Sequence, residues 1–143
     1  MKTILTAVAM VVTLAPAWAL ACDGEQEVST PPEIQKLDVQ RLAELQKKAA
    51  IKIYDANTQK TRTEQGIIPG ATMLTSASQY DVAKELTPTK NTPIVFYCAN
   101  EMCRASHVAA ERAVGAGYTN VSVLPAGIIG WKAAGQKVSK PNT

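Results

Sequence analysis

The fold of this chain is decided by Pro93-Ile94-Val95-Phe96-Tyr97-Cys98-Ala99-Asn100-Glu101-Met102-Cys103-Arg104-Ala105-Ser106. The four residues after the proline are β-branched or aromatic, which predicts a buried strand over 94–97. From 105 to 114 small apolar side chains recur at the spacing of one helical face, which predicts a helix. A strand therefore runs into a helix through a short loop that begins at Cys98.

The place of Cys98 at the end of this strand indicates a reactive thiol. The loop returns the chain so that the first turn of the helix, with its unpaired N–H groups and partial positive charge, faces the cysteine. Such surroundings lower a thiol pKa from about 8.5 to roughly 3.5–7.5. We expect Cys98 to be a nucleophile, and the alternative is a buried structural thiol, since free cysteine is among the most buried residue types.

The first 21 residues have the layout of an export signal. Lys2 supplies a positive start, residues 4–14 form an apolar stretch too short to span a bilayer, and Ala19-Leu20-Ala21 is a small-residue cleavage site. We expect an exported, periplasmic protein that starts at Leu20 or Cys22. Cys22 directly after the cut also allows the alternative of a lipoprotein anchored at that residue. The remaining chain has no second apolar stretch, so no membrane span is expected.

Four segments follow from composition and periodicity. We expect a signal peptide over 1–21, a flexible leader over 22–36, one domain over 37–138 and a C-terminal tail over 139–143. Within the domain, strands and helices alternate, with strands at 51–54, 72–74, 94–97 and 121–124 and helices at 37–48, 78–86, 105–114 and 127–135. The polar residues 56–65 are expected to form a surface loop. This alternation predicts an α/β fold, a doubly wound and mostly parallel sheet with helices on both faces.

The charge balance excludes some partners. The chain has 15 Lys and Arg residues against 12 Asp and Glu residues, with a net charge of +3. Lysine and arginine do not cluster as a nucleic-acid surface requires, so no nucleic-acid partner is expected. A metal site is not expected either, because two loop cysteines and the single histidine fall short of the usual four ligands.

Four landmarks together resemble the single-domain rhodaneses, a family of sulfurtransferases. They are Ile53-Tyr54-Asp55, Gly66-Ile67-Ile68-Pro69-Gly70-Ala71, Val95-Phe96-Tyr97-Cys98, and Gly117-Tyr118-Thr119-Asn120-Val121 followed by Gly127 and Trp131. The resemblance covers about residues 37–138. It implies a doubly wound parallel sheet and a cysteine that takes a sulfane sulfur from a small anionic donor such as thiosulfate. The sulfur then passes to a thiol or cyanide acceptor, and no cofactor is involved.

The same resemblance assigns roles to the loop. It implies that Cys98 carries the persulfide and that the main-chain N–H groups hold the anionic donor at Ala99, Asn100, Glu101, Met102, Cys103 and Arg104. Asp55 and Ser106 are expected to support the site. The chain departs from the family pattern at Ile67, where a histidine is usual, and at Asn57, where an arginine is common. Its loop is also about two residues longer, lacks a glycine, and resembles a subgroup with Cys-x4-Cys-x2-Ser.

Several loop residues have more than one interpretation. Cys103 can receive or resolve the persulfide, form a disulfide with Cys98, or simply line the loop. Arg104 can stabilise the thiolate or be a solvated residue, while the carboxylate of Glu101 disfavours both a thiolate and an anionic donor. Asp55 can be a turn residue, and His107 can pair with a glutamate one helical turn further on. Ser106 can be an ordinary helix residue.

Two other functions remain open. The spacing Cys98-x5-Arg104 is that of cysteine phosphatases and predicts, as an alternative, a rhodanese-fold phosphatase or arsenate reductase. A non-catalytic redox-sensing or binding module is the third possibility. For the leading hypothesis the sequence predicts that Cys98→Ser abolishes sulfur transfer, whereas Cys103→Ser keeps persulfide formation, because Cys98 alone is expected at the focus of the loop N–H groups.

Overall fold

The computed structural model describes residues 32–141 as alternating strands and helices. The strands are β1 (Gln35–Lys36), β2 (Lys52–Asp55), β3 (Thr72–Met73), β4 (Ile94–Tyr97) and β5 (Val121–Leu124). The helices are α1 (Val39–Lys47), α2 (Gln59–Gln65), α3 (Val82–Glu85), α4 (Ala105–Gly115) and α5 (Gly127–Ala133).

All five strands run parallel in one sheet, in the order β1-β5-β4-β2-β3. β4 lies at the centre, and its four residues are all buried. Its last residue, Tyr97, lies opposite Asp55 of β2 and Leu124 of β5. The expected doubly wound α/β fold is confirmed, and the carboxyl ends of β2, β4 and β5 meet at one edge of the sheet.

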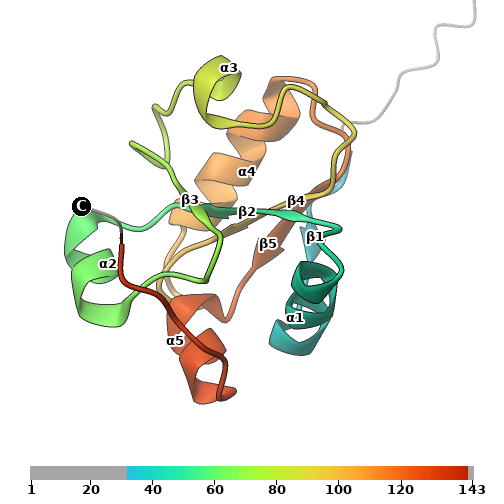
Figure 1. Cartoon of the computed structure of the whole chain (residues 1–143). Helices are drawn as coiled ribbons and strands as arrows, with labels where there is room; N and C mark the ends of the chain where they lie inside the picture. Colours follow the sequence, from blue (N-terminus) through green and yellow to red (C-terminus); the bar gives the residue numbers. More distant parts are fainter. Residues whose placement is uncertain (1–31, 142–143) are drawn as a thin grey trace, which may run out of the picture.

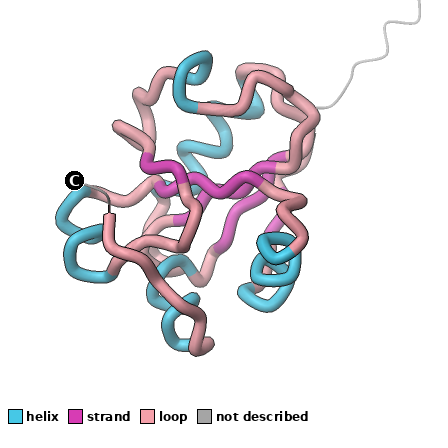
Figure 2. Tube along the Cα trace, in the orientation of Figure 1, coloured by secondary structure: helices cyan, strands magenta, loops and turns pink. Residues whose placement is uncertain are grey.

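Helices cover both faces of the sheet, as Figure 1 shows: α3 and α4 lie on one side, and α1 and α5 lie on the other. Alternate strand residues supply the two cores because successive side chains of a strand point to opposite faces. Phe96 packs with the alanines of α4, whereas Val95 and Tyr97 pack with α1 and α5. Trp131 of α5 is buried, as the sequence predicted. The strands, magenta in Figure 2, therefore form a layer between two layers of helix.

One expected loop is a helix. Residues 56–65 were predicted to be a surface loop, but α2 occupies Gln59–Gln65 and is capped by Thr58, whose side chain accepts the N–H of Thr61. Arg62 is the one buried side chain of this helix. The prediction was wrong because the helix has no apolar face, and hydrophobic periodicity is the signal by which helices are found in a sequence.

The sheet starts before the predicted domain boundary at 37. Gln35 and Lys36, assigned to the leader over 22–36, form β1 and pair with β5. At the other end Ser139, the first residue of the expected tail, exchanges two backbone hydrogen bonds with Ile67, each of 2.9 Å. The expected signal peptide, Cys22 and most of the leader lie outside the described residues. Between residues 32 and 141, no helix is both long and apolar enough to span a membrane.

Candidate active site

The loop between β4 and α4 lies at the carboxyl edge of the sheet, where open α/β sheets bind their ligands. Cys98 follows the last residue of β4 and is only 1% exposed. Its thiol lies 2.9 Å from the main-chain oxygen of Cys103 and 3.3 Å from the hydroxyl oxygen of Ser106. The structure therefore brings Cys98, Cys103 and Ser106 together, as the motif suggested, with Cys98 innermost.

The surroundings of Cys98 favour its protonated form. Burial, followed by the contact with the Cys103 side chain, raises the pKa of the Cys98 thiol above its ordinary value. The hydroxyl and the backbone N–H of Ser106 act in the opposite direction. The first turn of α4 thus does face Cys98, as expected, but its effect is smaller than the cost of removing a thiolate from water.

Cys103 has the opposite electrostatic environment. It is partly exposed, and although partial burial opposes its ionisation, hydrogen bonds from the Cys98 thiol and from the N–H groups of Ala99 and Ala105 lower its pKa. The expectation that only Cys98 can lie at the focus of the loop N–H groups is therefore wrong. The loop folds back on itself, so that the N–H of Ala99 in the loop and that of Ala105 at the start of α4 both interact with the second cysteine.

Cys103 also opens onto solvent through a hollow. The hollow has a volume of about 280 Å³ and is lined by Glu101, Cys103, Arg104 and His107. A water molecule takes about 30 Å³ in the liquid, so this space suits a small anion or a single thiol. Arg104 lines this hollow beside Cys103, and Cys98 is not one of the lining residues. His107 lines it too, whereas the sequence interpretation predicted a surface ion pair for this residue.

Asn100 fixes the turn of the loop. Its main-chain oxygen accepts the N–H of Cys103, and its side-chain oxygen accepts the N–H of Met102, both at 3.1 Å. The N–H groups of Met102 and Cys103, expected to hold an anionic donor, are thus hydrogen-bonded within the loop. The side chain of Met102 is 92% exposed at the loop tip.

The start of α5 holds the other side of the loop. The N–H groups of Ile128 and Ile129 donate to the main-chain oxygens of Cys98 and Ala99, at 2.9 and 3.0 Å. Gly127 has a φ of +60°, and a Cβ atom there would lie 2.5 Å from the backbone of Cys98 and Ala99. Gly127 was quoted only as a landmark, and the structure gives it a physical role: a side chain would exclude the loop from this position.

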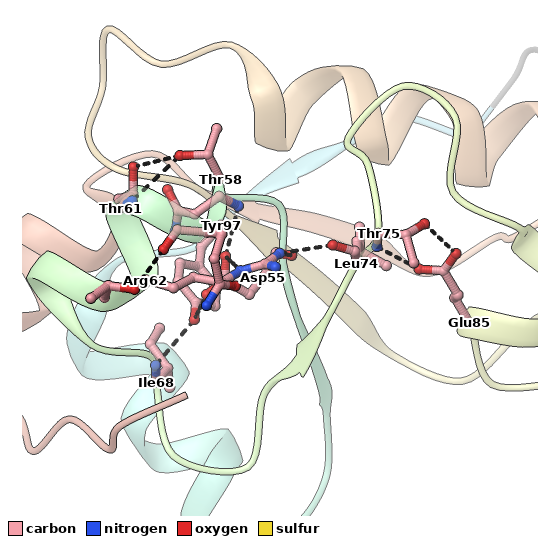
Figure 3. A network of polar contacts seen from close by, with 12 residues as sticks. Asp55, Thr58, Thr61, Arg62, Ile68, Leu74, Thr75, Glu85 and Tyr97 are labelled. Carbon is pink, nitrogen blue, oxygen red and sulfur yellow. Dashed lines mark hydrogen bonds and ion pairs between the residues drawn. The ribbon is translucent and has the colours of Figure 1, made fainter. Parts of the chain in front are cut away.

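Asp55 belongs to a buried polar network behind the site (Figure 3). Its carboxylate accepts the Tyr97 hydroxyl at 2.6 Å and the N–H of Asn57 at 2.7 Å. The Tyr97 oxygen in turn accepts the N–H of Ile68 at 3.1 Å. Burial and the neighbouring carboxylate raise the pKa of Tyr97. Asp55 therefore supports the site through Tyr97, the residue before Cys98, and ties three segments of the chain together.

Arg62 completes this network and was missed by the sequence interpretation. Its Nη2 donates to the main-chain oxygens of Asp55 and Leu74, at 2.9 and 2.8 Å, and its Nε lies 3.5 Å from the Asp55 carboxylate. Nε makes an ion pair here without the alignment of a hydrogen bond. The one signal in the sequence was the departure at Asn57, where the family resemblance implies an arginine.

Metal binding has no support from the described residues. No group of three or more His, Cys, Asp or Glu side chains between residues 32 and 141 is arranged to hold a metal ion.

An open parallel sheet with a cysteine loop between its central strand and a helix defines a class of α/β proteins. Residues 38–134 match the rhodanese-like domain family, and the chain belongs to that family. The resemblance inferred from the four landmarks is thereby confirmed at the level of the rhodanese-like domain. No curated protein matches the chain.

Solved structures share the fold at low sequence identity. A thiosulfate sulfurtransferase from Pseudomonas aeruginosa is 26% identical with a TM-score of 0.62, and the match covers 77% of this chain and 21% of that protein. A protein of unknown function from Rhodopseudomonas palustris, described as a possible tyrosine phosphatase, is 24% identical with a TM-score of 0.61 and coverages of 73% and 84%. A human single-domain sulfurtransferase is 20% identical with a TM-score of 0.55 and coverages of 73% and 96%.

Proposed function

We propose that this protein is a sulfurtransferase that moves a sulfane sulfur from an anionic donor such as thiosulfate, through a persulfide on Cys98, to a thiol or cyanide acceptor. Membership of the rhodanese-like family supports this proposal. The observation that carries it is the pair of cysteines in one loop at the carboxyl edge of β4, with the sulfur of Cys98 in contact with Cys103 and Ser106.

The chemistry needs no cofactor. A loop thiolate attacks the outer sulfur of thiosulfate, the S–S bond of the donor breaks, and sulfite leaves with the electron pair. The protein then holds a persulfide. An acceptor nucleophile attacks the outer sulfur of that persulfide and releases the cysteine thiolate, so that neither step requires an oxidant or a reductant.

We further propose that the protein acts outside the cytoplasm, in the periplasm of its host. The layout of residues 1–21 supports export, with a lipid anchor at Cys22 as the alternative. An oxidising compartment gives the cysteine pair a second chemistry, because two neighbouring thiols can close to a disulfide there.

A phosphatase or arsenate reductase is the second candidate, supported by the spacing Cys98-x5-Arg104. Such an enzyme must surround its nucleophile with N–H groups that bind the oxyanion. Two of the loop N–H groups, those of Met102 and Cys103, are bonded to Asn100 instead, and Arg104 lines the hollow at Cys103. These contacts count against an oxyanion cradle around Cys98, and membership of the rhodanese-like family supports sulfur transfer as the leading proposal. A non-catalytic redox-sensing module is the third candidate, and it requires only that Cys98 and Cys103 can close to a disulfide.

Mass spectrometry of the reduced protein after incubation with thiosulfate tests the proposal. We expect a gain of one sulfur atom per chain and a stoichiometric release of sulfite. Proteolysis after Glu101 separates the two cysteines onto different peptides and locates the sulfur, which we expect on Cys98 at equilibrium. Hydrolysis of p-nitrophenyl phosphate without sulfur uptake supports the phosphatase instead, and neither activity favours the redox-sensing module.

A further inference from the structure

The two loop cysteines differ in their access to solvent. Cys98 is 1% exposed and is enclosed by the carbonyl of Cys103 and the hydroxyl of Ser106. Cys103 is partly exposed and forms a wall of the 280 Å³ hollow. A donor in solution reaches the sulfur of Cys103 first.

We propose that sulfur enters this protein through Cys103, which attacks the donor, and is then passed to Cys98, which stores it. This relay rests on the proposed sulfur transfer and assigns its first step to the second cysteine of the loop. The residue at the strand end is then the internal carrier, and the hollow at the start of α4 is the donor site.

The charges around the hollow suit an anionic donor on one side. Arg104 lies just before α4, and His107 lies on its first turn. Both line the hollow together with Cys103. The carboxylate of Glu101, which lies within the turn from Asn100 to Cys103, lines the hollow as well and opposes an anion on its side. We assign Arg104 to the sulfonate of the donor, because a guanidinium pairs with a planar or tetrahedral oxyanion through two parallel hydrogen bonds.

The electrostatics of the pair agree with this order of events. Although partial burial opposes it, the Cys98 side chain and the N–H groups of Ala99 and Ala105 lower the pKa of Cys103, whereas burial raises that of Cys98. These shifts favour ionisation of the thiol that lines the hollow over ionisation of the buried thiol.

Each step balances without another reactant. The Cys103 thiolate bonds to the outer sulfur of thiosulfate, and sulfite leaves with the electrons of the broken S–S bond. The Cys98 proton moves to the terminal sulfur of the new persulfide, and the Cys98 thiolate then attacks that sulfur. Cys98 becomes the persulfide, and Cys103 leaves as a thiolate, ready to return the sulfur to an acceptor by the reverse step.

Storage at Cys98 has a physical advantage. A persulfide that is open to solvent reacts with any thiol that reaches it, whereas Cys98 is buried and its sulfur lies against the main-chain oxygens of Asn100 and Cys103. The relay therefore separates capture, which requires exposure, from retention, which requires burial.

Alkylation of the reduced wild-type protein tests which thiol meets solvent, and it does so without any donor. A brief pulse of iodoacetamide, followed by proteolysis after Glu101, should label Cys103 faster than Cys98 by on the order of tenfold or more. Faster labelling of Cys98 overturns the relay, whether or not the protein transfers sulfur.

Single-turnover sulfite release tests the order of the steps. Cys103→Ser and Cys98→Ser are controls for each other, because each removes one thiol from the same loop, and their circular dichroism is compared with that of the wild type. Cys98→Ser should still release sulfite in a single turnover and carry a short-lived persulfide on Cys103, because the first step of the relay forms no bond to Cys98. Cys103→Ser should release sulfite on the order of tenfold more slowly or not at all.

The outcomes separate the two proposals. If Cys103→Ser takes up sulfur at the wild-type rate and Cys98→Ser takes up none, the relay is wrong and sulfur transfer through Cys98 alone stands. If the wild type takes up no sulfur, the proposed function fails, and the alkylation pulse still decides which cysteine is the accessible nucleophile. This expectation for Cys98→Ser differs from the one drawn from the sequence, which was complete loss.

Discussion

The thiol of Cys98 lies 2.9 Å from the main-chain oxygen of Cys103, so the loop that leaves β4 folds back over its own first residue. Asn100 makes this return possible by accepting the N–H groups of Met102 and Cys103. The start of α5 fixes the backbone of Cys98 from the other side. The loop is thus a closed cover over Cys98 that carries Cys103 on its outer surface.

This arrangement predicts a disulfide between the two cysteines. Mild oxidation with diamide should remove both loop thiols within one chain and block sulfur uptake, because the attacking thiolate is consumed, and dithiothreitol should restore both. Thiol counting in a Cys22→Ser background measures the loop pair alone. Two free thiols after oxidation, or a dimer linked between chains, contradicts the prediction.

The pH dependence of alkylation should differ between the two cysteines. Only a thiolate reacts, so a lowered pKa moves the rise in rate to lower pH and a raised pKa moves it to higher pH. The rate at Cys103 should reach half its maximum below the ordinary cysteine value of about 8.5, and that at Cys98 above it. Site-resolved mass spectrometry over a pH series measures both curves. Coincident curves would show that the two thiols have the same environment.

Gly127→Ala should destabilise the protein and loosen the loop. The left-handed φ of +60° costs a residue with a Cβ roughly 1–2 kcal/mol. The Cβ would also meet the backbone of Cys98 and Ala99 at 2.5 Å, and such overpacking costs typically about 1–3 kcal/mol. Denaturant unfolding measures the change.

Gly115→Ala is the matched control for this substitution. Gly115 is the last residue of α4, and a Cβ there meets nothing within 4 Å. Replacing a helical glycine by alanine should stabilise the protein by about 0.4–1 kcal/mol. Equal losses from both substitutions would mean that the contact with Cys98 and Ala99 is not the cause.

Tyr97→Phe should destabilise the protein by about 1–3 kcal/mol, because the buried Asp55 carboxylate would lose one of its hydrogen-bond partners and the buried N–H of Ile68 would lose the hydroxyl that accepts it. Tyr118→Phe is the comparison, since it also removes one hydroxyl, but from a hydrogen bond to the uncharged Thr87 carbonyl. Its cost should be nearer 0.5–1.5 kcal/mol. Thermal unfolding ranks the two, and the reverse order contradicts the support assigned to Asp55.

Export predicts a processed N-terminus. Sequencing of the protein recovered from the periplasm should begin at Leu20 or Cys22, because Ala19-Leu20-Ala21 presents small residues to a signal peptidase. A diacylglycerol-sized mass on Cys22 would identify the anchored alternative. Full-length protein that starts at Met1 and remains in the cytoplasm would contradict export.

The sequence by itself determined the architecture. Local hydrophobic periodicity predicts the strands and helices, as in the apolar run over 94–97 and the small-residue face over 105–114. Such periodicity can be read from neighbouring residues alone, whatever the tertiary arrangement of the chain. The same pattern placed Cys98 at the edge of the sheet where sites form. The sequence interpretation missed α2 and Arg62, because a polar helix whose one buried side chain is an arginine has no hydrophobic periodicity.

Only the tertiary structure decided which cysteine faces the solvent. That choice depends on hydrogen bonds between residues far apart in the chain, such as Ile128 to Cys98, and on the close approach that Gly127 allows. It also depends on burial, which acts on a thiol through everything packed around it. The spacing of two cysteines in a sequence determines neither the long-range hydrogen bonds nor the burial. The sequence therefore predicted only that Cys98 and Cys103 share one loop, whereas the tertiary structure buries Cys98 and leaves Cys103 partly exposed.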